Sequence, residues 1–158
     1  MRPGAFDFSA AHSVADAVAQ LRDAGPDAKV ISGGQSLLPM MRVRLAQPSH
    51  LVDINQLQEL DYIRVQDGRL KVGALVRHAA LARSEQVQRH LPLLAEMAAE
   101  TGDAQIRTRG TLGGVMAHAD PAGDYPTLAI MLDATIVTDR RRIAAADFFQ
   151  HLFTTALE

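Results

Sequence analysis

The sequence contains no cysteine among its 158 residues. This absence excludes disulfide bonds, thiolate zinc sites, cysteine-ligated iron–sulfur clusters and cysteine nucleophiles within the chain. It fits a reducing compartment, and we expect a cytoplasmic location. The N-terminal residues show no apolar run of the signal-peptide type, and the sequence predicts no membrane span.

An excess of charge of one sign is also lacking. Sixteen lysines and arginines are set against 18 aspartates and glutamates, which gives a formal net charge of −2. Nucleic-acid binding requires a concentrated basic face, so no nucleic-acid partner is expected. Hydrophobic residues make up 47% of the chain and charged residues 22%, so the chain can bury a core. This length predicts one domain or two small subdomains.

The first third of the chain predicts a small βαβ unit. Ser13 and Asp16 have the spacing of a capping box, and Gly25-Pro26 ends the helix that follows. One crossover helix separates the first two strands, so we expect them to be parallel. The predicted elements are a strand at 6–8, a helix at 14–21, a strand at 30–31, a helix at 37–43 and a strand at 50–54.

A glycine pair, Gly33-Gly34, stands between the second strand and the second helix. Glycines allow a close approach of the backbone to a ligand, and free N–H groups at such a turn favour an anion. In α/β folds, ligands commonly bind at the C-terminal ends of parallel strands. Taken alone, the pair indicates either a phosphate-binding turn or an ordinary one.

The remainder of the chain predicts antiparallel strands and helices. Asp67-Gly68 stands between two β-prone runs and is a hairpin signal. Residues 102–125 are rich in glycine and polar groups, and we expect a long irregular and functional loop there. The other predicted elements are strands at 60–65 and 70–74, helices at 77–84, 92–101 and 126–132, strands at 134–138 and 142–145, and a last turn at 148–149 capped by Asp147.

A second glycine-rich stretch, Gly110-Thr-Leu-Gly-Gly114, strengthens the case for an anionic ligand. Two such turns could supply the donors that a dinucleotide pyrophosphate needs, with hydroxyls from Ser36 and Thr111. Arg107 and Arg109 lie near the second turn and could screen the phosphates. Neither stretch is a Rossmann G-x-G-x-x-G or a Walker A motif.

Asp124 follows the second glycine stretch and precedes an apolar run. Its carboxylate could accept hydrogen bonds from sugar-like hydroxyls, or it could be a helix N-cap. Asp120, before Pro121, could be a turn residue. The spacing of His118, Asp120 and Asp124 matches no established ligand pattern, so no metal is expected.

Five segments, in order along the chain, resemble one known family. The family is the FAD-binding medium subunit of the molybdenum hydroxylases, of the aerobic carbon monoxide dehydrogenase type. The resemblance implies an α+β flavin fold of the p-cresol methylhydroxylase type, with a small N-terminal βαβ subdomain (1–57), a larger mixed or antiparallel α+β subdomain (58–158), and FAD between them. The segments are 32–39, 51–54, 72–78, 106–114 and 119–126.

The resemblance also implies which residues contact FAD. Residues 32–36 would hold the pyrophosphate, Thr111 and Gly114 would approach from the second subdomain, and Asp124 would bind the ribityl chain or nearby hydroxyls. The implied cofactor-binding residues are Ile31, Ser32, Gly33, Gly34, Gln35, Ser36, Leu37, Thr101, Gly102, Thr111, Gly114 and Asp124.

Among these residues, two pairs are assigned to the surroundings of the flavin. Thr101 and Gly102 would lie against it, and Ile31 and Leu37 would flank the cofactor. The second turn usually continues with Asn or Ser in the family, whereas Val115 stands here. The resemblance therefore implies that one donor to FAD is missing.

The implied function is electron transfer. A molybdopterin-binding large subunit would oxidise the substrate, a [2Fe-2S] small subunit would pass electrons on, and FAD in this chain would deliver them to an acceptor. Family members continue beyond the position of Glu158 into a domain that helps to cover the flavin, so we expect a truncated form, an isolated domain or a short paralogue, with a more exposed and more weakly bound flavin. The alternatives are a non-catalytic assembly module that has lost FAD, and a stand-alone flavin oxidoreductase.

Overall fold

Leu51 and Val52 are both fully buried, and the strand that contains them is the middle strand of the N-terminal sheet. Adjacent residues of a strand point to opposite faces, so this strand is covered on both sides. The structure is a computed structural model that describes residues 2–157. The elements of this part are β1 (Asp7–Ala10), α1 (Val14–Ala24), β2 (Ala28–Ile31), α2 (Leu37–Arg42) and β3 (His50–Asp53).

The predicted parallel direction of β1 and β2 is confirmed, but these strands do not pair with each other. The order is β1-β3-β2, with β3 parallel to both neighbours. The predicted start of α1 is also confirmed, since Ser13 Oγ accepts from Asp16 N at 3.0 Å. The carboxylate of Asp16 accepts from His12 N at 2.8 Å, and Gly25 ends the helix with a φ of 85°.

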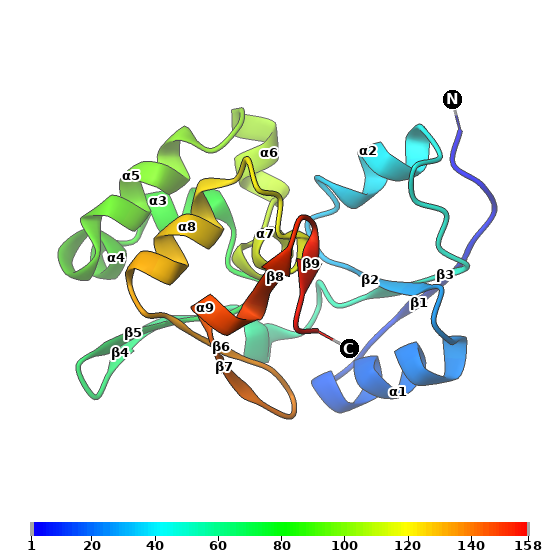
Figure 1. Ribbon diagram of the computed structural model, residues 1–158, viewed down its shortest axis with the longest axis horizontal. Helices are drawn as coiled ribbons and strands as arrows, with labels where there is room; N and C mark the ends of the chain where they lie inside the picture. The colour runs from blue at the N-terminus through cyan, green and yellow to red at the C-terminus, as the bar shows by residue number, and fades with distance from the viewer. Residues whose placement is uncertain (1, 158) are drawn as a thin grey trace.

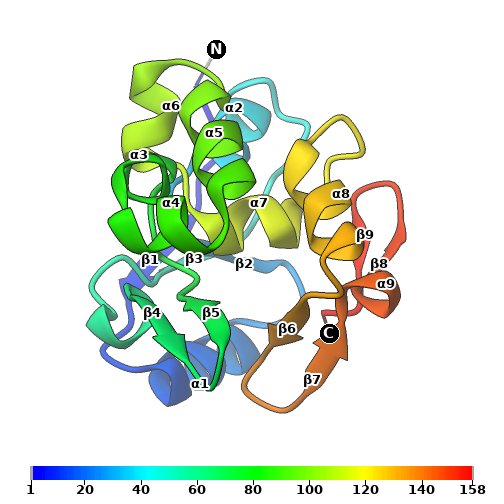
Figure 2. The ribbon, with the colours of Figure 1, turned by 90° about the vertical axis from the view of Figure 1, so that its left-hand side faces the viewer.

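The larger part of the chain packs helices against short hairpins around one main core. Figure 1 shows it beside the N-terminal sheet, and Figure 2 shows α3, α4 and α5 stacked over the β4–β5 hairpin. Its first elements are η1 (Gln58–Leu60), β4 (Ile63–Gln66), β5 (Arg69–Val72), α3 (His78–Arg83), α4 (Glu85–His90), α5 (Pro92–Glu100) and α6 (Ala104–Arg109). The later ones are α7 (Leu112–His118), α8 (Asp124–Met131), β6 (Thr135–Val137), β7 (Arg142–Ala144), α9 (Ala145–Phe148), β8 (Phe149–His151) and β9 (Thr154–Thr155).

The Asp67-Gly68 hairpin is confirmed: β4 and β5 are antiparallel, and both turn residues have positive φ angles, 54° and 71°. The predicted irregular loop at 102–125 is wrong, because α6 and α7 lie within it. Asp103 caps α6 by accepting from Ile106 N at 2.8 Å. Thr111 caps α7, which contains Gly113 and Gly114, so local capping outweighs the low helix propensity of these two glycines.

Other differences lie at element boundaries. The strand predicted from residue 60 starts at 63, because Gln58–Leu60 forms a 3-10 turn. The prediction missed α4, which Ser84 caps by accepting from Val87 N at 3.3 Å. Asp147 does not cap a final turn, since it lies inside α9, whose N-cap is Ala144. The β8–β9 hairpin was not predicted either.

The observed fold is α+β, as predicted. A small core of Ala11, Ala17 and Val52 supports the N-terminal sheet, whereas the main core gathers side chains from Val76 to Ala145. We retain the division into 1–57 and 58–158 as a proposal. Among residues 2–157, no helix combines the length and the apolar character needed to cross a membrane.

Candidate functional site

The loop after β2 presents a row of unused backbone donors. Within the described chain, the N–H groups of Gly33, Gly34, Gln35 and Ser36 donate to no atom. Gly34 has a φ of 73°, a conformation that glycine adopts without strain. The side chain of Gln35 donates from Nε2 to Gly33 O at 3.0 Å and so stabilises the loop internally. Successive free N–H groups of this kind form an anion-binding nest.

The second glycine pair is not a turn, contrary to the prediction, because Gly113 and Gly114 lie in the first turn of α7. Gly113 N donates to Ala74 O at 2.8 Å, and Gly114 N donates to Thr111 Oγ1 at 3.1 Å. Thr111 is the N-cap of α7 and is only 2% exposed. In this loop the hydroxyl of Thr111 therefore caps the helix, and the glycines serve mainly close packing.

The two loops touch each other. Ser32 Oγ and Thr111 Oγ1 lie 3.0 Å apart. A Cβ on Gly33 would lie 2.4 Å from Arg109 O, and one on Gly114 would lie 3.3 Å from Ser32 Oγ. A side chain at residue 33 would push the loops apart, so this contact requires glycine. The structure thus brings together Ser32, Gly33, Thr111 and Gly114, as expected for a two-sided site.

Thr101 and Gly102 form a turn that Arg107 stabilises. Arg107 Nη1 donates to Thr101 O at 3.2 Å and to Gly102 O at 2.7 Å. Gly102 has a φ of 52°, again in the region that favours glycine. The guanidinium of Arg107 is therefore engaged with these carbonyls, and its predicted part in phosphate screening is not needed to explain its position.

A buried polar network lies behind the second loop. Tyr125 Oη and His78 Nδ1 lie 2.7 Å apart, and Thr101 Oγ1 lies 3.4 Å from Tyr125 Oη. Burial lowers the pKa of His78 to about 4 and raises the pKa of Tyr125 above its ordinary value. At neutral pH both groups are therefore uncharged, and one hydrogen bond joins them. His78 N also donates to Gly110 O at 3.1 Å, so the network supports the loop from inside.

Asp124 is the first residue of α8, and its N-cap is Gly123, so Asp124 itself is not the cap. Its side chain is exposed and accepts no hydrogen bond from residues 2–157. Asp120 is a turn residue, as one interpretation held, since its Oδ1 accepts from Ala122 N at 2.9 Å. Across the described residues, no three histidines, aspartates or glutamates gather into a metal-binding group. Instead, the ring of His118 packs on Phe153, with the centroids 5.2 Å apart.

The remaining predicted residues lie around the first loop. Ile31 ends β2 and Leu37 starts α2, and both are half-buried. Two residues that the sequence did not single out join the loops: Asn55 donates to Ser32 O, and Arg77 donates to Asn55 Oδ1 and to Arg109 O. The position of Asn55, two residues after a buried parallel strand, was the signal that could have found it.

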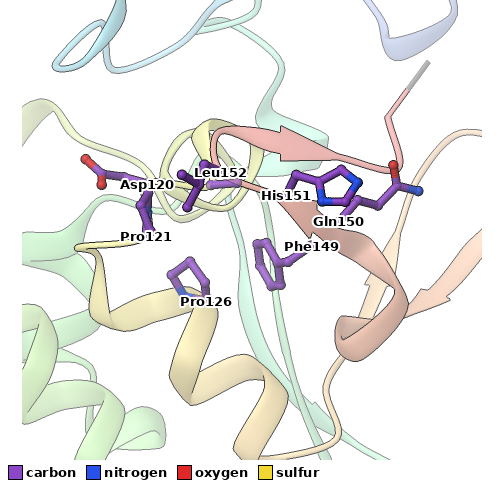
Figure 3. Close-up of a pocket in the computed structure, with 8 residues that line it drawn as sticks. Asp120, Pro121, Pro126, Phe149, Gln150, His151 and Leu152 are labelled. Carbon is purple, nitrogen blue, oxygen red and sulfur yellow. The ribbon is translucent and has the colours of Figure 1, made fainter.

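A separate cavity of about 400 Å³ lies between the start of α8 and the β8–β9 hairpin (Figure 3). Pro126 and Phe149 face each other across it, and His151 lies on its hairpin side. None of the predicted cofactor-binding residues lines it. This cavity is therefore not the candidate site. The candidate site consists of the free backbone donors and the close contacts between the two loops.

The donor set fits the pyrophosphate of a dinucleotide. Four free N–H groups and the hydroxyls of Ser32 and Thr111 lie where two parts of the chain meet. Such an arrangement is typical of sites that bind anionic, phosphate-bearing ligands. The profile of the family described as "FAD binding domain in molybdopterin dehydrogenase" matches residues 4–158. The chain belongs to this family, which confirms the resemblance, and its cofactor is FAD.

Known proteins resemble the chain in sequence and in structure. The carbon monoxide dehydrogenase medium chain of Hydrogenophaga pseudoflava is 45% identical over 162 residues, covering 100% of this chain and 56% of its own length. The 6-hydroxypseudooxynicotine dehydrogenase complex subunit alpha of Paenarthrobacter nicotinovorans is 47% identical over 136 residues, covering 86% of this chain and 46% of its own length. This chain thus spans about half the length of the curated relatives it matches.

Two solved structures agree with this assignment. Carbon monoxide dehydrogenase from Hydrogenophaga pseudoflava, in a form lacking the Mo-pyranopterin moiety, matches with a TM-score of 0.97 and 45% identity, covering 100% of this chain and 56% of that one. Quinoline 2-oxidoreductase from Pseudomonas putida 86 matches with a TM-score of 0.95 and 38% identity, covering 100% and 56%. Both structures therefore share the fold of this chain over its full length.

Proposed function

We propose that the chain is the FAD-binding electron-transfer part of a molybdenum hydroxylase of the carbon monoxide dehydrogenase type. It would relay electrons from the iron–sulfur clusters of a partner subunit, by way of its FAD, to an acceptor. The observation that carries the proposal is the nest of four free N–H groups at 33–36, in contact with the Thr111 loop. FAD, when bound, supplies the redox chemistry, and the protein binds and orients it.

The proposed roles of the residues follow from these contacts. The N–H groups of 33–36 would bind the pyrophosphate, with the hydroxyls of Ser32 and Thr111 beside them. The exposed carboxylate of Asp124 is able to accept hydrogen bonds from ribityl hydroxyls. Val115 packs against the main core, so the free donors do not depend on its side chain.

The proposed partners are a molybdopterin-binding large subunit and a [2Fe-2S] small subunit. The 158 residues contain no cysteine with which to ligate a cluster, which supports a separate iron–sulfur subunit. The relatives are named as medium chains or subunits of dehydrogenase complexes, which supports the same assembly. A cytoplasmic location is part of this proposal.

Flavin binding is tested first. The purified chain, stripped of ligand, is titrated with FAD while flavin fluorescence and the visible spectrum are recorded. We expect saturable binding that Gly33→Ala weakens about tenfold or more, since its Cβ would strike Arg109 O. Gly4→Ala is the matched control, because its Cβ would meet only Gln47 Oε1 at 3.9 Å. If the chain binds no FAD, the proposal is overturned. The remaining alternative is then a non-catalytic assembly module that has lost FAD.

The assembly is tested separately. The chain is isolated from its source organism under mild conditions, and the co-purifying subunits are analysed for iron, acid-labile sulfide and molybdenum. We expect both partners in fixed stoichiometry with flavin. A flavin-containing chain that reduces an acceptor with no partner present would instead support the stand-alone oxidoreductase.

A further inference from the structure

The side chains of Arg77 and Asn55 form a continuous hydrogen-bonded link between the two loops of the site. Asn55 Nδ2 donates to Ser32 O at 2.8 Å, and Asn55 Oδ1 accepts from Arg77 Nη2 at 2.6 Å. Arg77 Nη1 donates to the carbonyl oxygen of Arg109. We call these two side chains the Arg77–Asn55 bridge. It joins the first loop to the second through side chains from different parts of the chain.

Both ends of the bridge start from ordered elements. Asp53, the last residue of the central strand β3, accepts from Asn55 Nδ2 at 2.5 Å and from Asn55 N at 2.9 Å. Arg77 immediately precedes α3 and forms an isolated antiparallel β-bridge with Thr111. The amide and the guanidinium therefore have little freedom to turn away, which is what a positioning contact requires.

The carbonyl of Arg109 has two neighbours in this arrangement. It accepts from Arg77 Nη1, and it is also the atom that a Cβ on Gly33 would meet at 2.4 Å. Arg77 thus holds the carbonyl that limits how closely the first loop approaches. On the other side, Asn55 holds the carbonyl of Ser32, immediately before the four free N–H groups.

The surroundings of Arg77 indicate that it acts through the directions of its hydrogen bonds and not through its charge alone. Its side chain is half-buried, and its two η nitrogens point to acceptors on different elements. A guanidinium is a planar fork with fixed donor directions, whereas the lysine ammonium is a point charge on a flexible stem. Lysine would keep the positive charge at residue 77 but would not make both contacts in the same geometry.

We infer that Arg77 and Asn55 are positioning residues for FAD, which set the separation and orientation of the two cofactor-binding loops by acting through Ser32 and Arg109. The inference rests on the proposed function, because it assumes that FAD binds between these loops. It predicts that cofactor affinity depends on the fork of Arg77 and on the amide of Asn55, and not simply on positive charge.

The test uses the full chain with Arg77→Lys, Arg77→Met and Asn55→Asp. Asn55→Asp keeps an acceptor for Arg77 but removes the donor to Ser32 O and to Asp53 Oδ1, and it places a second carboxylate beside Asp53. Arg83→Met, at the exposed C-terminal end of α3, is the control for loss of a cation. For each protein we would measure FAD affinity by fluorescence titration, the visible circular dichroism of the bound flavin, and the melting temperature without FAD.

All three bridge variants are expected to weaken FAD binding by about tenfold or more and to alter the flavin dichroism, with Arg77→Lys within about threefold of Arg77→Met. Arg83→Met should bind within about twofold of the unaltered chain. Full affinity in Arg77→Lys would overturn the inference, since charge alone would then suffice. Melting temperatures lowered to the point of unfolding in all three variants would also overturn it, in favour of a purely structural role. Absence of FAD binding in the unaltered chain would remove the proposed function itself.

Discussion

His78 and Tyr125 carry polar atoms into the main core, where each is only 4% exposed. Their hydrogen bond satisfies both groups, and neither is left unpaired at a cost in stability. The ring of His78 also lies against Gly110, where a Cβ would be 2.7 Å from Cδ2. A single imidazole thus connects the core with the loop that carries Thr111, and its ionisation should affect stability.

The pH dependence of stability follows from the lowered pKa of His78. The folded pKa is about 4 and the unfolded value about 6.5, so between these pH values the unfolded chain binds a proton that the folded one does not. As the pH falls from about 6.5 to about 4, His78 should account for a loss of up to about 3 kcal/mol, and little further loss below.

Urea unfolding from pH 7 to pH 4 would measure this effect. His78→Gln keeps an acceptor for Tyr125 but does not titrate, so its unfolding free energy should fall less steeply over the same range. Other groups that titrate near pH 4 are shared by both proteins, so the difference between the two slopes is the readout. Equal slopes would show that His78 does not cause the loss.

Helix α7 carries the second loop, and its start depends on Thr111. The side chain of Thr111 accepts from Gly114 N and contacts Ser32 Oγ, so one hydroxyl both caps the helix and meets the opposite loop. Helix α1 has a cap of the same kind without the second contact: Ser13 Oγ accepts from Asp16 N. A comparison of substitutions at Ser13 and Thr111 can therefore separate the effect of losing a helix cap from the effect of losing the contact between the loops.

Thr111→Val and Ser13→Ala should each lower the free energy of unfolding by about 1 kcal/mol, because each removes an N-cap. Only Thr111→Val should also weaken FAD binding, by about tenfold, since it alone removes a hydroxyl from the site. Denaturant unfolding and FAD titration of both variants provide the check. An equal loss of FAD affinity in Ser13→Ala would mean that the effect comes from general destabilisation.

At the scale of the whole molecule, the two loops come from parts with unequal cores. The N-terminal sheet rests on Ala11, Ala17 and Val52, whereas the larger part has a far more extensive cluster. The contacts of Ser32 and Gly33 with the second loop lie at the boundary of these parts. A ligand held by both loops should therefore stabilise the folded chain as a whole.

FAD at about 100 times its dissociation constant should add about 2.7 kcal/mol to the stability, which corresponds to a rise in melting temperature of roughly 5–10 °C. Riboflavin at the same concentration should give little or no rise, because it has no phosphate for the free N–H groups of 33–36. Thermal melts with each ligand measure the difference. A riboflavin shift as large as that of FAD would contradict pyrophosphate binding by this loop.

Local sequence determined much of this protein. The Ser13 cap, the Asp67-Gly68 hairpin and the glycine turn after β2 follow from residue chemistry that acts over a few positions. The ordered motifs were sufficient for the family and for FAD. Glycine content gave a wrong prediction at α7, where the Thr111 cap outweighs the low helix propensity of Gly113 and Gly114.

The tertiary structure alone decided which donors stay free and which residues join the loops. Gly33 and Gly113 look alike in sequence, yet the N–H of Gly33 is unused while that of Gly113 donates to Ala74 O. Asn55 and Arg77 are 22 positions apart, and no local pattern pairs them. Their contact exists because β3 lies at the centre of its sheet and the start of α3 lies against the second loop. Such long-range packing contacts are not specified by local residue chemistry.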